Sequence, residues 1–100
     1  MAKASMDLQS KWLALRQKHE QTKFRFVNVE LDLAITYCLV AMAATDRARA
    51  CRNLANAERA YCVAACFLNG GLNAEQNRAI KTKLVRFRSL RVNCDDIQIQ

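Results

Sequence analysis

Proline is absent from this chain, and glycine occurs only at Gly70 and Gly71. Because proline and glycine interrupt helices, their scarcity allows long helices and argues against a strand-rich fold, which needs many turns. Hydrophobic residues make up 52% of the sequence and charged residues 25%, a balance typical of globular rather than disordered proteins. A length of 100 residues suits one domain. We therefore expect a single all-α domain over residues 1–100.

The sequence also lacks the residue patterns that carry catalysis and metal binding. Histidine occurs once, at His19, and no cysteines form a C-x-x-C pair, whereas zinc needs about four Cys or His ligands. Neither a Cys/His pair, a Ser/His/Asp arrangement nor a glycine-rich phosphate loop can be assembled. We expect no enzyme activity, no metal and no cofactor. An enzyme that uses Glu58 and Asp32 with a bound metal or ligand is the least favoured alternative.

The chain has five cysteines, an odd number that is unlike a disulfide framework and suggests a reducing compartment. Cys62 and Cys66 share one face of a predicted helix, which would suit half of a metal site or a regulatory disulfide. Small core residues are the simpler interpretation, and we expect both cysteines to be buried.

No apolar run at the N-terminus resembles a signal peptide, because Lys3, Asp7 and Lys11 interrupt it. The longest uncharged helical run, residues 33–45, is shorter than a membrane span, which takes about 20 residues. We expect a cytoplasmic protein that is neither exported nor inserted in a membrane.

Apolar residues recur at spacings of three and four in the first part of the chain, which predicts one amphipathic helix over residues 7–44. Its apolar seam contains Leu8, Trp12, Leu15, Phe26, Val29, Leu33 and Val40, with His19, Thr22 and Thr36 at equivalent positions. From residue 31 onward nearly every position is apolar, so we expect other helices to surround that end.

Two further helices are predicted over residues 46–68 and 74–92. Asp46 can cap the second helix, and Gly70 and Gly71 can end it in the left-handed conformation. Asn73 and Gln76 have the spacing of a capping box at the start of the third helix.

Beyond residue 92 we expect a polar tail that contains Asp95 and Asp96. The third helix should bury Ile80, Leu84, Phe87 and Leu90, which repeat at helical spacing.

The predicted helices differ in reach, because 1.5 Å per residue gives roughly 57 Å for the first, 34 Å for the second and 28 Å for the third. Helices that fold back from residue 45 can cover the first helix only to about Lys23. The apolar stripe before it should then be exposed, and such stripes usually mark interfaces. We expect self-association through this exposed stripe, most simply as a two-fold dimer. The interface comprises Leu8, Trp12, Leu15 and His19, with Phe26 closing the seam.

The alternative is a first helix that breaks near Gln21-Thr22 and folds back into a monomeric four-helix bundle. No glycine or proline supports a break there, so we favour the straight helix.

Glu58 falls in the middle of the apolar face of the second helix, where a carboxylate needs a partner. Arg91 lies on the apolar side of the third helix, and we predict a buried Glu58–Arg91 ion pair. Lys83 lies at the edge of the same side. For Asp32, in the apolar half of the first helix, a gap that faces solvent is the simpler interpretation, and a polar cluster with Glu58 is the alternative.

The formal charge of +7 favours acidic partners. The third helix is rich in basic residues, but at helical spacing they scatter around it instead of forming one binding face. A small nucleic-acid-binding protein that uses Arg78, Lys81 and Arg88 is therefore the alternative function, and a solvated basic surface is the simpler interpretation.

The spacing Ala57-x-x-x-Tyr61-x-x-Ala64 resembles the second helix of a tetratricopeptide repeat, although Asn69 stands where that repeat has proline. A hairpin followed by a basic helix is also similar to three-helix modules of the MIT type, which bind peptide helices. The resemblance implies a scaffold or adaptor role, with a helical peptide or another protein as a further partner class. We expect a protein-interaction module that self-associates through its first helix.

Overall fold

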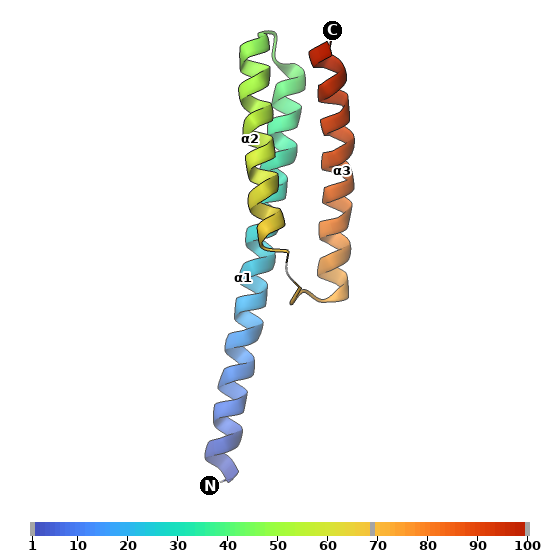
Figure 1. Cartoon of the computed structure of the whole chain (residues 1–100). Helices are drawn as coiled ribbons and strands as arrows, with labels where there is room; N and C mark the ends of the chain where they lie inside the picture. Colours follow the sequence, from blue (N-terminus) through green and yellow to red (C-terminus); the bar gives the residue numbers. More distant parts are fainter. Residues whose placement is uncertain (1, 69, 100) are drawn as a thin grey trace.

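The computed structural model describes the backbone of residues 2–68 and 70–99 and the side chains of residues 7–68 and 70–94. Three helices follow one another: α1 (Ala2–Ala43), α2 (Arg47–Cys66) and α3 (Ala74–Ile99). They account for all regular structure in the described residues, so the predicted all-α class is confirmed. Helices α2 and α3 lie beside the second half of α1, whereas its first half extends alone, and the molecule measures 71 × 21 × 17 Å (Figure 1).

Helix α1 is continuous over 42 residues, and the expected straight helix is confirmed. The fold-back at Gln21-Thr22 is therefore wrong. With no glycine or proline to open the helix, the Thr22 hydroxyl instead donates to the carbonyl oxygen of Lys18 at 2.9 Å, one turn earlier. The long first helix is thus an uninterrupted rod.

Helix α2 begins as predicted, because the carboxylate of Asp46 accepts a hydrogen bond from the backbone N–H of Ala48 at 3.0 Å. It ends at Cys66, earlier than the predicted residue 68, where the N–H of Phe67 bonds to the carbonyl oxygen of Ala64 and tightens the last turn. The chain then turns at Gly70 and Gly71, whose φ angles of 91° and 82° require glycine.

The predicted capping box at the start of α3 is confirmed. The Gln76 side chain accepts from the backbone N–H of Asn73 at 3.1 Å, and the Asn73 side chain accepts from the N–H of Gln76 at 2.8 Å. The polar tail expected after residue 92 is instead helical to Ile99. No helix breaker follows residue 92, and Cys94, 2% exposed, adds a core contact beyond it. The side chains of Asp95 and Asp96 lie outside the described residues.

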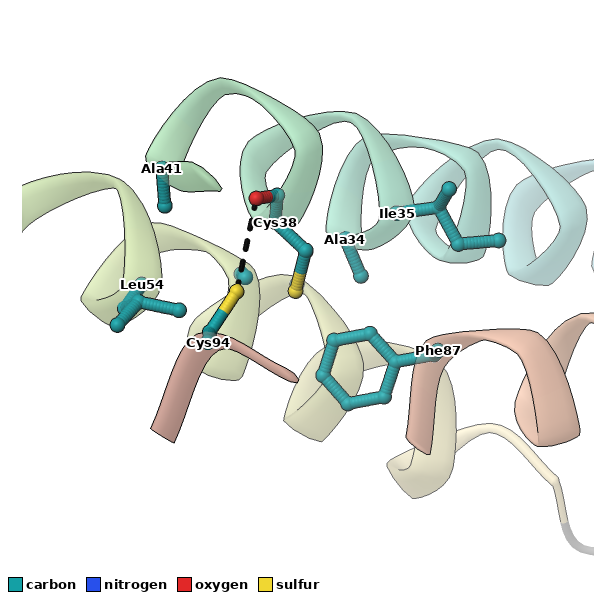
Figure 2. Close-up of a cluster of buried hydrophobic side chains, with 9 residues drawn as sticks. Ala34, Ile35, Cys38, Ala41, Leu54, Phe87 and Cys94 are labelled. Carbon is teal, nitrogen blue, oxygen red and sulfur yellow. Dashed lines mark hydrogen bonds between the residues drawn. The ribbon is translucent and has the colours of Figure 1, made fainter. Parts of the chain in front are cut away.

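The core of the bundle is built on one face of α1, which we call the inner seam. It consists of Val27, Leu31, Ala34, Cys38 and Ala41, all buried. In Figure 2 the side chains of Ala34, Cys38 and Ala41 point toward Leu54 of α2 and toward Phe87 and Cys94 of α3. Val27 and Leu31 form a second cluster with Ala64 of α2 and Ile80 of α3. Tyr61 of α2 stacks on Phe87 with ring centroids 4.9 Å apart, which joins α2 to α3.

The inner seam is not the stripe that the sequence spacing selected. Leu33 and Val40 of the predicted seam remain exposed beside the hairpin. The inner seam is rich in small residues, and α2 meets it with Ala57 and Ala60, which are buried in the same cluster as Ala34. Small residues let helix axes approach closely, so α2 and α3 pack on this face rather than on the bulkier one.

By length and composition alone, α1 could also cross a membrane, a test that the core helix of a soluble protein passes as well. The apolar stretch that reaches this length begins before the uncharged run of residues 33–45 and contains Glu30 and Asp32. In the structure, part of that stretch packs on α2 and α3 through the inner seam.

Candidate interaction surface

A second stripe of apolar side chains runs along α1, away from the inner seam, and we call it the outer seam. Its members follow the alternating spacing of four and three residues that is typical of a coiled-coil interface. They are Leu8, Trp12, Leu15, His19, Thr22, Phe26, Val29, Leu33, Thr36 and Val40. Every one of these side chains is exposed. The outer seam is therefore open to solvent over its whole length.

The exposure is greatest in the part of α1 that extends beyond the hairpin, residues 7–22, which we call the leading half. Here Leu8 is 70% exposed, Trp12 66% and Leu15 63%. A large, contiguous apolar surface of this kind is unusual on a monomer. The structure thus places four of the five predicted interface residues, including His19, on one uncovered face.

The cover that the hairpin gives to α1 stops near Lys23. The ammonium of Lys23 donates to the carbonyl oxygen of Gly70 at 2.8 Å, which ties α1 to the turn between α2 and α3. Phe26, the fifth predicted interface residue, packs edge to face against Phe67, with centroids 5.0 Å apart, and is still 40% exposed. This boundary agrees with the reach calculated from the predicted helix lengths.

Beside this boundary the surface is hollowed. A hollow of about 470 Å³ is lined by residues of the leading half, among them Trp12, Leu15 and His19, and is closed at one side by Gly71. A second hollow of about 320 Å³ continues it past His19 toward Phe26 and Phe67. The lining is largely apolar, so these hollows suit bulky apolar side chains of a partner rather than a charged ligand.

The two threonines of the outer seam are compatible with a dry interface. The hydroxyl of Thr22 bonds within α1, and that of Thr36 donates to the carbonyl oxygen of Asp32 at 2.8 Å. Because both hydroxyls already have a partner in their own helix, their burial would leave no polar group unsatisfied.

The predicted Glu58–Arg91 pair forms, with the Arg91 Nε donating to Glu58 Oε1. The Glu58 side chain is 45% exposed and that of Arg91 27%, so the expectation of a buried pair is wrong. Both side chains keep part of their surface in solvent at the edge of the bundle. The pair fastens α3 to α2 at the margin of the core.

Asp32 has a partner that the sequence did not identify, because Lys83 Nζ lies 2.7 Å from its carboxylate. This pair fastens α3 to α1, and no polar cluster joins Asp32 to Glu58. Asp32 pairs with Lys83 because α1 and α3 bring the two side chains close together. The spacing of residues along one helix does not give this distance between helices.

The residues of the alternative nucleic-acid surface, Arg78, Lys81 and Arg88, are all exposed on α3. Two other basic residues of this helix, Lys83 and Arg91, are engaged in the interhelical ion pairs. The remaining charges are spread around the exposed part of α3, without a stacking aromatic residue among them.

The cysteines divide into two groups. Cys38 and Cys94 are buried, and the Cys94 thiol donates to the carbonyl oxygen of Cys38 at 3.6 Å (Figure 2). Burial, followed by the neighbouring Cys94, raises the pKa of the Cys38 thiol to about 11. Cys51, Cys62 and Cys66 are exposed. The predicted place of Cys62 and Cys66 in the core is therefore wrong, because the small side chains of α2 that are buried belong to alanines.

Among the described side chains, no three His, Cys, Asp or Glu residues lie close enough together to hold a metal ion. The class that the fold defines is a helical hairpin packed on one half of a much longer helix. Comparison with protein-family models, curated proteins and solved structures finds no match.

Proposed function

We propose that this chain is a protein-interaction module that self-associates through the outer seam of α1. The observation that carries the proposal is the exposure of Trp12 and Leu15 on a helix half that no other part of the described chain covers. Burying a side chain of this size contributes about 1.5–3 kcal/mol, which in a symmetric dimer counts twice.

The shape of the leading half supports the same proposal. A single helix that extends into water gains little from tertiary packing, although most helix stability in proteins comes from such packing. Association would supply the missing contacts to Leu8, Trp12 and Leu15. A scaffold role fits this arrangement, because the hairpin at the other end stays accessible while the rods pair.

Light scattering and sedimentation equilibrium of the full chain test the proposal, with a mass of two 11.4-kDa chains expected at micromolar concentration. The Leu15→Ser variant should raise the dissociation constant by about 100-fold, because two apolar contacts are lost per dimer. A full chain that remains monomeric at high concentration would refute self-association.

Leu13→Ser is the matched control. Leu13 is 55% exposed in the same helix turn, but it lies off the outer seam. Its replacement removes similar apolar surface and leaves the proposed contact intact, so association should be unchanged. Equal losses for Leu13→Ser and Leu15→Ser would show that nonspecific hydrophobicity, and not this seam, holds the chains together.

A further inference from the structure

The outer seam continues past the leading half into residues 23–43, the covered half of α1. There Val29 is 55% exposed, Leu33 40% and Val40 43%, although α2 and α3 pack on the same stretch of helix. At 100° per residue these side chains lie on the opposite side of α1 from the inner seam. The hairpin therefore leaves a second apolar surface open on the covered half.

We propose that a second copy of the chain fills this surface by docking its α1 antiparallel, so that the leading half of each copy lies on the covered half of the other. The inference rests on the proposed self-association and adds its direction and register. In this register Leu8 faces Val40 of the second copy, Trp12 faces Thr36 and Leu15 faces Leu33. The contact would extend over roughly 48 Å of helix.

The side-chain sizes match in this register. The two largest residues of the outer seam, Trp12 and Phe26, face the two small threonines, Thr36 and Thr22, of the other copy. Large residues opposite small ones interlock without voids or overpacking. His19 faces Val29 of the second copy, so the one ionisable residue of the outer seam does not lie opposite the second copy's His19.

Charges beside the seam select the antiparallel direction. The positions that flank the leading half are basic and include Lys11, Arg16 and Lys18, whereas those that flank the covered half include Glu30 and Asp32. In antiparallel coiled coils, equivalent flanks of the two helices face one another. Arg16 then faces Glu30 of the second copy, and Lys18 faces Asp32.

A parallel pair of α1 helices would bring like charges together in the leading half. It would place Lys11 beside Arg16 and Lys18 beside Lys23 on both sides of the dimer, which is repulsive, and would join opposite charges only at Arg25 and Glu30. In the antiparallel register like charges meet only near the two-fold axis. There Lys23 faces Lys23 of the second copy, and Arg25 faces Arg25 of the second copy. Lys23 is already bound to the carbonyl oxygen of Gly70, which draws its ammonium away from the axis.

The bundle leaves room for this arrangement. Because α2 and α3 pack on the inner seam, they leave Val29, Leu33 and Val40 exposed, although Phe67 at the end of α2 touches the outer seam at Phe26. In the antiparallel pair the two hairpins would stand at opposite ends of the dimer. Asp32 is bound to Lys83 yet its side chain is 57% exposed, so it can also accept Lys18 of the second copy.

Charge reversal in two variants tests direction and register. Arg16→Glu alone places a new carboxylate opposite Glu30 twice in each dimer, and Glu30→Arg alone places two arginines opposite each other. Each should raise the dissociation constant by about tenfold or more in sedimentation equilibrium at low salt. Mixed in equal amounts, the two variants should form a heterodimer with nearly the affinity of the parent, because both contacts then join opposite charges.

The mixture separates this pairing from local effects. Arg16 also pairs with Glu20 in its own helix at 3.6 Å, and Arg16→Glu loses that pair in every state, so recovery on mixing can arise only between chains. Arg52→Glu on the exposed side of α2 is the matched control and should leave the affinity unchanged. Far-UV circular dichroism should show parent-like helix content in all variants.

The alternatives give different results. Stronger association of Arg16→Glu would overturn the antiparallel direction, because a parallel dimer places that residue beside Lys11. A parent that dimerises while mixing gives no recovery would overturn the register and leave the proposed function standing. A parent that never dimerises would refute the proposed function and this inference together.

Discussion

The two halves of α1 have the same apolar spacing and opposite surroundings. In the covered half, Val27, Leu31 and Cys38 are fully buried by the hairpin. In the leading half, Trp12 and Leu15 are about two-thirds exposed, at 66% and 63%. These residues lie on different faces of α1, because the hairpin covers the inner seam and leaves the outer seam open in both halves. Helical periodicity identifies which residues share a face, but packing between helices decides which face is covered.

The contrast also holds between the two faces of the covered half. Apart from Leu31, the inner seam consists mainly of small residues, whereas the outer seam contains the bulkier Phe26, Val29 and Leu33. The hairpin can therefore pack closely on the inner seam, and the outer seam remains exposed. A helix that is apolar on two sides is expected to have neighbours on two sides. In the described residues, α2 and α3 supply neighbours on the side of the inner seam.

Removal of most of the leading half should have the largest effect on association and little effect on the hairpin. A chain that starts at Glu20 keeps the Lys23–Gly70 contact and the whole inner seam, so it should fold with a free energy of unfolding within about 1 kcal/mol of the full monomer. It should lose self-association entirely, as measured by light scattering. Undiminished association would locate the contact on the hairpin, and loss of folding would show that the two halves are one cooperative unit.

Truncation of a single leucine on each face should separate the covered face from the open one. Leu31→Ala removes a side chain that is 0% exposed and should lower the free energy of unfolding by about 2–5 kcal/mol. Leu33→Ala, two residues away and 40% exposed, should cost the monomer about 1 kcal/mol or less. Urea unfolding of dilute protein measures both. Similar costs would contradict the division of α1 into a covered and an open face.

Much of this fold could be predicted from the sequence because local signals decide it. Asp46, Asn73 and Gln76 cap helices through hydrogen bonds to backbone groups within three residues, and Gly70 and Gly71 adopt positive φ. The reach of each helix also follows from residue count, which is how the exposed leading half was predicted.

The parts that could not be predicted depend on contacts between helices. A helical wheel places Asp32 and Lys83 on their own helices but gives no distance between them, so their ion pair was missed. The same limit misplaced Cys62, because the apolar arc of α2 is wider than the strip that α1 and α3 cover. The outer seam was predicted as far as Val40, but the expectation that the other helices cover its second half is wrong, because they pack on the inner seam.

The buried Cys38 thiol should make the stability of the covered half depend on pH. The pKa of Cys38 is about 11 in the fold against an ordinary value of 9.0, so between these values the folded state holds the proton that the unfolded state loses. Stability should therefore fall as the pH rises from 9 to 11, by up to about 1.4 kcal/mol per unit. Stability is insensitive to this group below pH 9, where both states are protonated.

The control for this measurement is Cys38→Ala, which should lower the stability overall but flatten the slope between pH 9 and 11. Subtraction of the two curves isolates the contribution of the Cys38 thiol. At neutral pH, a thiol reagent should modify the exposed Cys62 and Cys66 rapidly and Cys38 only after unfolding. An unchanged slope in Cys38→Ala would assign the pH dependence to another group.

The smallest effects are expected from ion pairs, and they should still differ between the two regions. Glu58→Ala removes the partner of Arg91 at the edge of the bundle and should lower the free energy of unfolding by about 1 kcal/mol, because both side chains are partly exposed. Glu58→Leu should cost less, since added apolar contact with the core offsets the lost pair. Glu20→Ala removes a pair in the leading half, where the Arg16 side chain is 67% exposed, and should change stability by less than about 0.5 kcal/mol. Equal effects of Glu58→Ala and Glu20→Ala in thermal unfolding would mean that the Arg91 pair contributes no more than a solvated contact, and that apolar packing alone holds α3 to α2.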